Sequence, residues 1–324
     1  MTAVPLEVRL HSTLASARPA LSAVQPRTIF STWEYLHSWW SVFGRGTLLC
    51  VEGIRNGAVQ IVAPLFADQG MVYFIGSGGS DYLDFLGDAG DPEALESVLR
   101  LAMNSTPDFC GFCFYHVPDH SPTGRILQTI SPALGLTPCV HYSLPAPVLT
   151  FASALSPPAR KKSLIRHENR MRRSGELSVE HLRTTHEILL SLDIFFDQHD
   201  ARSRQTGREI FFADIRQRRF YRELAAALPP NVILTRVLFN GQPAAFHFGF
   251  CYRGSFLWYK PCFSPALANY SPGEVLLRSL LQSTEDWGIH EFDFGLGEDA
   301  YKSRFATSVA SVTSWGMYPA GATQ

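Results

Sequence analysis

The sequence has no long apolar run and almost no excess of one charge. No run of apolar residues reaches the ~20 residues that a bilayer-spanning helix requires. Residues 1–26 place Glu7 and Arg9 inside their apolar part, so they lack the uninterrupted apolar core of a secretory signal. With 28 basic and 29 acidic residues the net charge is -1, which excludes a surface that is basic overall. We therefore expect a cytoplasmic protein without a transmembrane segment, in which any nucleic-acid or phosphate site is local.

The six cysteines lack the repeated spacing of a zinc-binding framework. Cys110 and Cys113 form a Cys-x-x-Cys, but no second one follows. They lie in FCGFCFYHV, residues 109–117, which is typical of a buried strand, and residues i and i+3 of a strand point to opposite faces. We interpret the cysteines as reduced core residues and expect no metal site, with a redox or zinc pair as the alternative.

Two halves of the chain repeat one order of elements. Hydrophobic residues make up 46% of the 324 residues and charged residues 18%, enough for two packed domains. Residues 48–66 and 233–250 each predict a strand, an Asn-Gly turn and a second strand, followed by an aromatic third strand, a Ser/Gly loop and a helix. A linker-like segment, SALSPPARKK, separates the halves at residues 153–162. We predict an α/β (α+β) fold with domains at 1–152 and 153–324.

A basic helix is expected directly after this linker, ending at Gly175. Lys162, Arg166, Arg170 and Arg173 are spaced by 4, 4 and 3 residues, which places all four on one helical face. Like charges on one face repel each other unless an anion lies opposite them. A solvated surface helix and a contact with a phosphate or polyanion both remain open.

The segment Tyr270-Ser-Pro-Gly-Glu274 predicts the start of another helix. Ser271 suits the N-cap position, Pro272 suits N1, and Glu274 completes a capping box with Ser271. A helix N-terminus can hold an anion. Pro272 removes one N–H donor, however, and the Glu274 carboxylate repels a phosphate, and both oppose anion binding at this helix end.

Polar residues follow the next strand, HEFDF, in the loop GLGEDAYKSRF. Asp293 lies in the strand, and glycines allow the backbone to turn after it. Tyr301 can donate a proton to a leaving group and Lys302 can hold an anionic one. The alternative is that Asp293 forms a structural bridge to Lys302 or Arg304. His247 is a candidate general base, with a satisfied core histidine as the alternative.

These residues resemble a known family. SPGEVLLRSLLQSTEDWGIHEFDFGLGEDAYKSRF is similar to the C-terminal signature of CelD/BcsL-type proteins, which are acetyltransferase-like members of the GNAT superfamily linked to cellulose and exopolysaccharide synthesis. The basic helix, FFDQHDARSRQTG and the segment from Gly241 to Gly273 also fit. The resemblance covers roughly residues 30–310 and is most specific from 241 to 305.

The resemblance implies tandem GNAT-like domains, each a mixed, largely antiparallel sheet flanked by helices. It implies acyl transfer to an amine or hydroxyl, with acetyl-CoA or another acyl-CoA as donor. The third meander strand, through Pro261, Cys262 and Phe263, would hold the pantetheine arm. The donor phosphates would lie near Ser271 and Gly273, with Arg166 and Arg170 as further contacts.

The sequence departs from the usual acetyl-CoA loop, Q/R-x-x-G-x-G/A, and has ANYSPG instead. That loop equally resembles Fem-type transferases, which take an aminoacyl group from tRNA. We expect an acyl-CoA-dependent N- or O-acyltransferase of exopolysaccharide or cell-envelope metabolism, with catalytic candidates His247, Asp293, Tyr301 and Lys302 and a small-molecule or saccharide-linked acceptor. A Fem-type tRNA-dependent transferase and a non-catalytic binding scaffold are the alternatives.

Overall fold

The computed structural model describes residues 4–153 and 157–321 and divides the chain into two compact units. Unit 1 comprises Met1–Pro145 and Ala310–Gln324, and unit 2 comprises Ala146–Val309. We expected one division at 152/153, whereas the chain passes into unit 2 after Pro145 and returns to unit 1 at Ala310, because the last strand lies in unit 1. Of the linker expected at 153–162, residues 154–156 lie outside the described part.

Unit 1 contains a mostly antiparallel sheet with helices on its faces. Its strands, in spatial order, are β1 (Glu7–His11), β2 (Thr47–Arg55), β3 (Ala58–Asp68), β4 (Met71–Phe74), β6 (Gly111–Pro118), β13 (Ser308–Pro319) and β7 (Leu136–Thr150), with β5 (Leu86–Gly87) beside β3. Its α-helices are α1 (Leu14–Ala23), α2 (Trp33–Phe43), α3 (Pro92–Asn104) and α4 (Thr123–Ile130). Thr32 caps the N-terminus of α2 and Gly44 its C-terminus.

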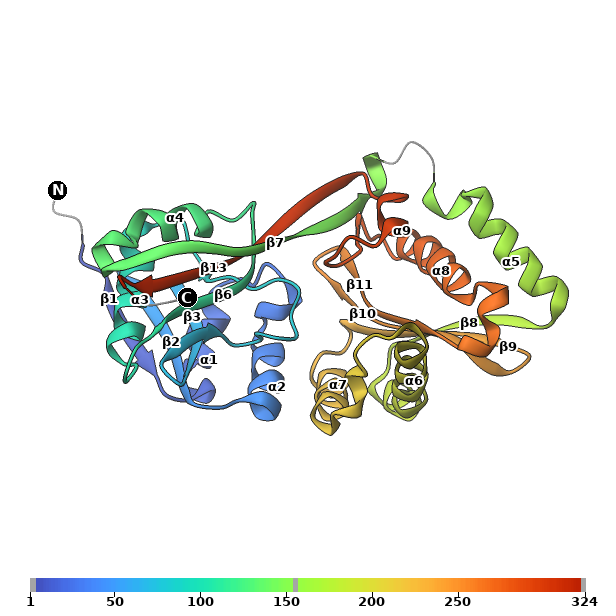
Figure 1. Cartoon of the computed structure of the whole chain (residues 1–324), viewed down its shortest axis with the longest axis horizontal. Coiled ribbons are helices and arrows are strands. Elements are labelled where there is room, and N and C mark those ends of the chain that lie inside the picture. Colours follow the sequence, from blue (N-terminus) through green and yellow to red (C-terminus); the bar gives the residue numbers. More distant parts are fainter. Residues whose placement is uncertain (1–3, 154–156, 322–324) are drawn as a thin grey trace. The chain divides into compact units, whose positions relative to one another are not determined.

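Unit 2 repeats this plan. Its sheet begins with the carboxyl end of β7 and continues with β12 (Glu291–Asp293), β11 (Ser255–Phe263), β10 (Gln242–Tyr252), β9 (Val232–Phe239) and β8 (Leu177–Leu182). Its α-helices are α5 (Lys162–Ser174), α6 (Thr185–Thr206), α7 (Ile215–Ala227), α8 (Pro272–Asp286) and α9 (Ala300–Ser303). Helices α5 and α8 lie on one face of this sheet and α6 and α7 on the other (Figure 1).

The two faces of the unit 2 sheet are packed differently. Leucines of α8, among them Leu276 and Leu280, are buried against Val237, Phe256 and Trp258. The opposite face is aromatic. Phe248 of β10 and Tyr259 of β11 are covered by rings from α6, from α7 and from the turn between these helices, namely Phe195, Phe196, Phe212 and Tyr221. Both faces are therefore buried, which explains why β10 reads as a nearly continuous apolar strand.

Each unit turns its hairpins at the sequences that predicted them. Asn56-Gly57 in unit 1 and Asn240-Gly241 in unit 2 have positive φ at both residues, as a type I′ turn requires. In each unit the third strand of the meander then pairs in parallel with the strand that follows the next helix, β4 with β6 and β11 with β12. The repeated order of elements predicted from the sequence is confirmed.

Within the described ranges no helix is both long and apolar enough to cross a bilayer.

The packing of α8 makes a direct prediction for stability. Leu280 is completely buried on α8, so Leu280→Ala should lower the free energy of unfolding by about 2–5 kcal/mol, measured by urea denaturation. Leu190 on α6 is 69% exposed, and Leu190→Ala is the matched control, expected within about 0.5 kcal/mol of wild type. Equal losses in the two variants would contradict the burial of α8.

Candidate active site

Strand β11 pairs with β12 only at its beginning. The parallel register joins Ser255, Phe256 and Leu257 to residues 291–293, and the described residues form no further β11–β12 pair. On its other side β11 carries a bulge, because Trp258 and Tyr259 lie opposite the single residue Gly249 of β10. The two parallel strands therefore separate after Leu257, and the edge of β11 that follows is open toward β12.

A tyrosine hydroxyl is held beside this separation. The indole Nε1–H of Trp258 donates to the hydroxyl oxygen of Tyr301 at 2.9 Å. Tyr301 is on the short helix α9, and burial raises its pKa to about 12. Its oxygen therefore accepts one hydrogen bond while its own proton remains in place, which is the state required of a proton donor.

The loop before α9 is closed by the ammonium group of Lys302. Lys302 is buried; its Nζ donates to the Leu296 carbonyl at 2.6 Å and lies 3.5 Å from a carboxylate oxygen of Asp299. The Oδ1 atom of Asp293 accepts from the amide of Gly295 at 2.8 Å and so fixes the start of the same loop. The structure thus places Asp293, at the end of β12, and Tyr301 and Lys302, on α9, at the two ends of one loop, and Asp293 and Lys302 hold the backbone of that loop.

His247 is completely buried on β10. Its Nε2 atom accepts the amide N–H of Tyr259 at 3.0 Å, and its ring stacks on Trp258 with centroids 4.5 Å apart. Burial lowers its pKa to about 3, so the imidazole is neutral. This geometry matches the core interpretation of His247 and does not suit a general base.

The three β11 residues expected at the donor differ in what they offer. Pro261 has no N–H and presents only its carbonyl. Cys262 is buried, its thiol 4.0 Å from the Phe195 carbonyl oxygen, and burial raises its pKa. Phe263 carries the guanidinium of Arg202 over its ring at 4.2 Å, next to the start of α8. The thiol is thus a packed core group, and the open edge is formed by backbone.

The capping box expected at the start of α8 is not formed. Ser271 has a left-handed backbone with φ of 56°, whereas an N-cap residue is extended. The Glu274 carboxylate instead accepts from Arg304 at 3.2 Å, because the guanidinium from the α9 segment provides a charged partner there. The first turn of α8 is therefore joined to the end of α9 by the ion pair between Glu274 and Arg304.

Few amides remain for an anion at this helix end. Pro272 has no N–H, and the amides of Ser271 and Glu274 donate to the carbonyls of Ala268 and Ser271. Within the described part of the chain, the Gly273 N–H has no hydrogen-bond partner. One amide beside a carboxylate forms a weak phosphate cradle, so anion binding here needs cationic side chains from elsewhere.

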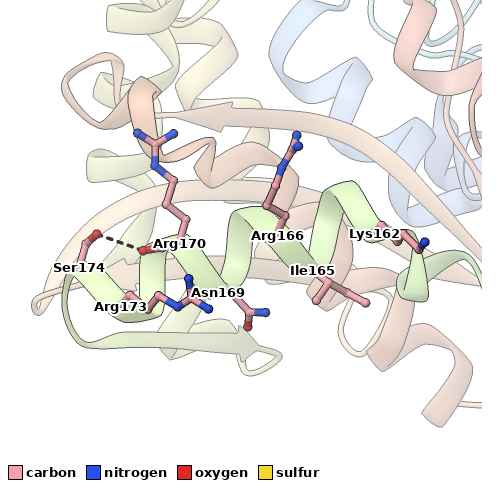
Figure 2. Close-up of a pocket in the computed structure, with 7 residues that line it drawn as sticks. All are labelled: Lys162, Ile165, Arg166, Asn169, Arg170, Arg173 and Ser174. Atoms are coloured by element: carbon pink, nitrogen blue, oxygen red, sulfur yellow. Dashed lines mark hydrogen bonds between the residues drawn. The ribbon is translucent and has the colours of Figure 1, made fainter.

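Helix α5 provides such side chains. Lys162, Arg166, Arg170 and Arg173 line a hollow of about 560 Å³ with Ile165, Asn169 and Ser174, and Arg166 and Arg170 extend on the same side of the helix (Figure 2). We call these four cations the α5 stripe. All four are exposed and have no ion-pair partner among the described residues. Arg170 lies 5.9 Å from the ring of Tyr270, so the stripe reaches the start of α8.

A polar cluster that the sequence pattern did not indicate lies on the α6 side. His199 packs against Phe211 and lies near Lys260 of β11, whose Nζ is 4.6 Å from the Phe211 ring centre. Burial and then the Lys260 charge lower the pKa of His199 to about 4, and its Nδ1 atom is buried without a hydrogen-bond partner among the described residues.

An ion pair between two loops connects this cluster to the α9 loop. Arg208, in the loop after α6, lies 3.6 Å from Asp299 at the start of α9. The segment FFDQHDARSRQTG contains His199 and the loop after it. Its pattern of apolar and charged residues predicts a helix but not the neighbours of that helix, because Lys260 and Asp299 lie more than 50 residues further along the chain.

No group of three or more His, Cys, Asp or Glu side chains in residues 4–153 and 157–321 is arranged to hold a metal ion.

The comparisons with known proteins identify the fold. A family model described as an acetyltransferase (GNAT) domain matches residues 158–303, which lie within unit 2. A search of curated proteins finds no match. Similar solved structures include FemX, with 12% identity and a TM-score of 0.68 over 97% of each chain. They also include the C-terminal domain of a putative lysylphosphatidylglycerol synthetase from Agrobacterium fabrum, with 14% identity and a TM-score of 0.55 over 80% of this chain and 81% of that one.

A tandem GNAT protein from the clavulanic acid biosynthesis pathway is also similar, with 11% identity and a TM-score of 0.52 over 99% of this chain and 100% of that one. At such identities the likeness shows the fold. The predicted fold of tandem GNAT-like domains, each a mixed, largely antiparallel sheet with flanking helices, is confirmed.

The neutral buried histidine predicts a pH dependence of stability. His247 titrates near pH 6.5 in the unfolded chain and near pH 3 when folded. Between these values only the unfolded state takes up the proton, so stability present above pH 6.5 is lost as the pH falls toward 3.

His247→Gln should therefore reduce the fall in unfolding free energy by up to about 1.4 kcal/mol per pH unit in this window, measured by urea denaturation at several pH values. His186→Gln, at an exposed histidine of α6, is the control and should keep the wild-type slope. An unchanged slope in His247→Gln would show that the folded histidine titrates normally.

Proposed function

We propose that unit 2 catalyses the transfer of an acyl group to an amine or hydroxyl at the opening between β11 and β12. The observation that carries this proposal is the Tyr301 hydroxyl, which the Trp258 indole holds beside the point where the two strands separate. The GNAT family model over residues 158–303 supports acyl transfer as the reaction class.

In the proposed reaction the acceptor attacks the carbonyl carbon of the acyl donor, and the bond to the leaving sulfur or oxygen breaks. Tyr301 gives its proton to the departing group. The acceptor loses its proton to the neutral imidazole of His199, which lies near Arg208 and so near the α9 loop that Arg208 contacts through Asp299. Lys302 and Asp293 keep the α9 loop in the conformation that presents Tyr301.

Acyl-CoA is the proposed donor, and its phosphates would be held mainly by side chains. The start of α8 offers the Gly273 amide, and Arg170 lies beside it over Tyr270. Arg166 is one turn away on the same face of α5 and would contact a second phosphate. The resemblance of residues 241–305 to CelD/BcsL-type proteins supports a saccharide-linked acceptor in exopolysaccharide or envelope metabolism.

The role of Tyr301 is tested by removing its hydroxyl. Tyr301→Phe should lower turnover about 10²–10⁴-fold, the range for an acid–base group, while the ring still fills its place. The measurement is product formation by mass spectrometry with a panel of acyl-CoAs and amine or saccharide acceptors. Tyr142→Phe in unit 1 removes a hydroxyl bonded to His116 and should retain wild-type turnover. Wild-type turnover in Tyr301→Phe would refute the assignment.

A second candidate donor is aminoacyl-tRNA, and the α5 stripe is the observation that favours it. Four cations without ion-pair partners among the described residues lie on one helical face, in a chain of net charge -1, and form a local surface for a phosphate backbone. Arginine, which supplies three of the four, bonds phosphate oxygens in pairs.

Salt dependence distinguishes the two donors. If tRNA binds the stripe, replacing Arg166 and Arg170 by Gln should reduce the slope of log affinity against log salt concentration by about 0.7–0.9 for each phosphate that these arginines neutralise. Fluorescence anisotropy with tRNA at several salt concentrations measures this slope. Arg172→Gln is the control, because Arg172 lies on the same helix but pairs with Glu168. Absence of tRNA binding alongside micromolar binding of acyl-CoA would exclude the second candidate.

A further inference from the structure

We propose that His247 is a positioning residue that fixes the point where β11 leaves β12 and holds the Trp258–Tyr301 pair in place, and that it carries no proton during the reaction. The inference rests on the proposed function, in which Tyr301 is the proton donor.

The first contact of His247 is with the backbone of the β11 bulge. A bulge leaves a backbone group without its partner in the sheet, and a buried N–H without an acceptor is costly. Here the amide of Tyr259, within the bulge, donates to Nε2 of His247 at 3.0 Å. The imidazole therefore accepts a main-chain hydrogen bond inside the bulge and stabilises it.

The second contact of His247 is with the preceding side chain. The indole of Trp258 stacks on the imidazole with an interplanar angle of 13°, and its N–H then reaches the Tyr301 hydroxyl. One buried ring thus holds the main chain at residue 259 and the side chain at residue 258. These residues directly follow Leu257, the last residue of β11 paired with β12.

The same contacts exclude a proton-accepting role. An imidazole nitrogen that accepts a hydrogen bond has no proton, so the neutral ring carries its proton on Nδ1. Nδ1 is buried and has no hydrogen-bond partner in the described residues. A proton arriving at Nε2 would displace the Tyr259 amide and open the bulge, so the ring performs its task only while neutral.

Gly249 shows how closely this ring is enclosed. A Cβ atom at position 249 would lie 2.1 Å from Cε1 of His247 and 2.7 Å from the Leu257 carbonyl oxygen. A glycine opposite the bulge is therefore required for the imidazole to occupy its place. Gly249→Ala should displace the ring without altering its chemistry, which provides a second route to the same test.

The experiment uses the full chain labelled with 5-fluorotryptophan and with ¹⁵N-histidine. The variants are His247→Leu, which lacks an acceptor, His247→Gln, whose amide oxygen can accept from Tyr259, and Gly249→Ala. His181→Gln is the control: His181 is another imidazole of unit 2 with a pKa lowered by burial, but it packs edge-on against Trp287. The ¹⁹F resonance of Trp258, assigned with Trp258→Phe, reports the indole, and ¹⁵N shifts report the protonation of His247.

The expected result has three parts. The ¹⁵N shifts of His247 stay constant from pH 5 to 9, with Nε2 unprotonated. The Trp258 resonance moves in His247→Leu and Gly249→Ala, returns toward wild type in His247→Gln, and is unchanged in His181→Gln. Turnover falls about 10²-fold in His247→Leu, the cost of a misplaced reacting group, while KM and the shape of the pH profile are unchanged.

Titration of His247 between pH 5 and 8, or loss of the acidic limb of the pH profile in His247→Leu, would overturn the inference in favour of a base. An unmoved Trp258 resonance in both His247→Leu and Gly249→Ala would also overturn it. If the wild-type protein shows no turnover with any donor, the proposed function fails, and the ¹⁹F and ¹⁵N measurements still decide the placement of Trp258 by His247.

Discussion

The hydrogen bond from the Tyr259 amide to His247 is the interaction on which the proposed unit 2 site depends. It lies in a bulge of two residues against one, which directly follows Leu257, the last residue of β11 that pairs with β12. In the proposed site, this bond and the stacking of the imidazole on Trp258 place the indole beside the point where the two strands separate. A fully buried ring is thus connected through Trp258 to Tyr301 on α9.

The two units share a plan but not a site. In unit 1 the helix that corresponds to α8 is α3, and its N-cap Asp91 accepts from the amides of Glu93 and Ala94. Arg55 pairs with both Asp91 and Glu93 at 2.7 Å. The chain's own carboxylates thus occupy the position where a bound anion would lie. In unit 2 the corresponding amides are few, but Arg170 of the α5 stripe lies close to them, which is why we propose that the donor binds in unit 2.

Local sequence patterns were sufficient to predict the helices, strands and turns. The arrangement of the candidate site depends on contacts between residues that are far apart in the sequence. The Asn-Gly turn at 240–241 and the start of α8 near Pro272 depend on neighbours in sequence, and both were predicted. The capping box failed because Arg304, thirty residues beyond Glu274, competes for its carboxylate. The role of His247 depends on a one-residue register shift that no periodicity reveals, and His199 gains its environment from Lys260 and Phe211 on other elements. A sequence pattern can predict that a residue is buried, but it cannot predict which atom of another residue will form a hydrogen bond with it.

The return of the chain to unit 1 has a consequence for the order of folding during synthesis. Strand β13 lies between β6 and β7, in the interior of the unit 1 sheet, yet it follows all of unit 2 along the chain. Until it emerges from the ribosome, β6 and β7 present unpaired edges, whereas unit 2 is complete at Val309. The nascent chain can therefore finish its second unit before its first. Throughout the synthesis of unit 2, the older unit still lacks one strand of its sheet, and its strand edges can pair with other chains.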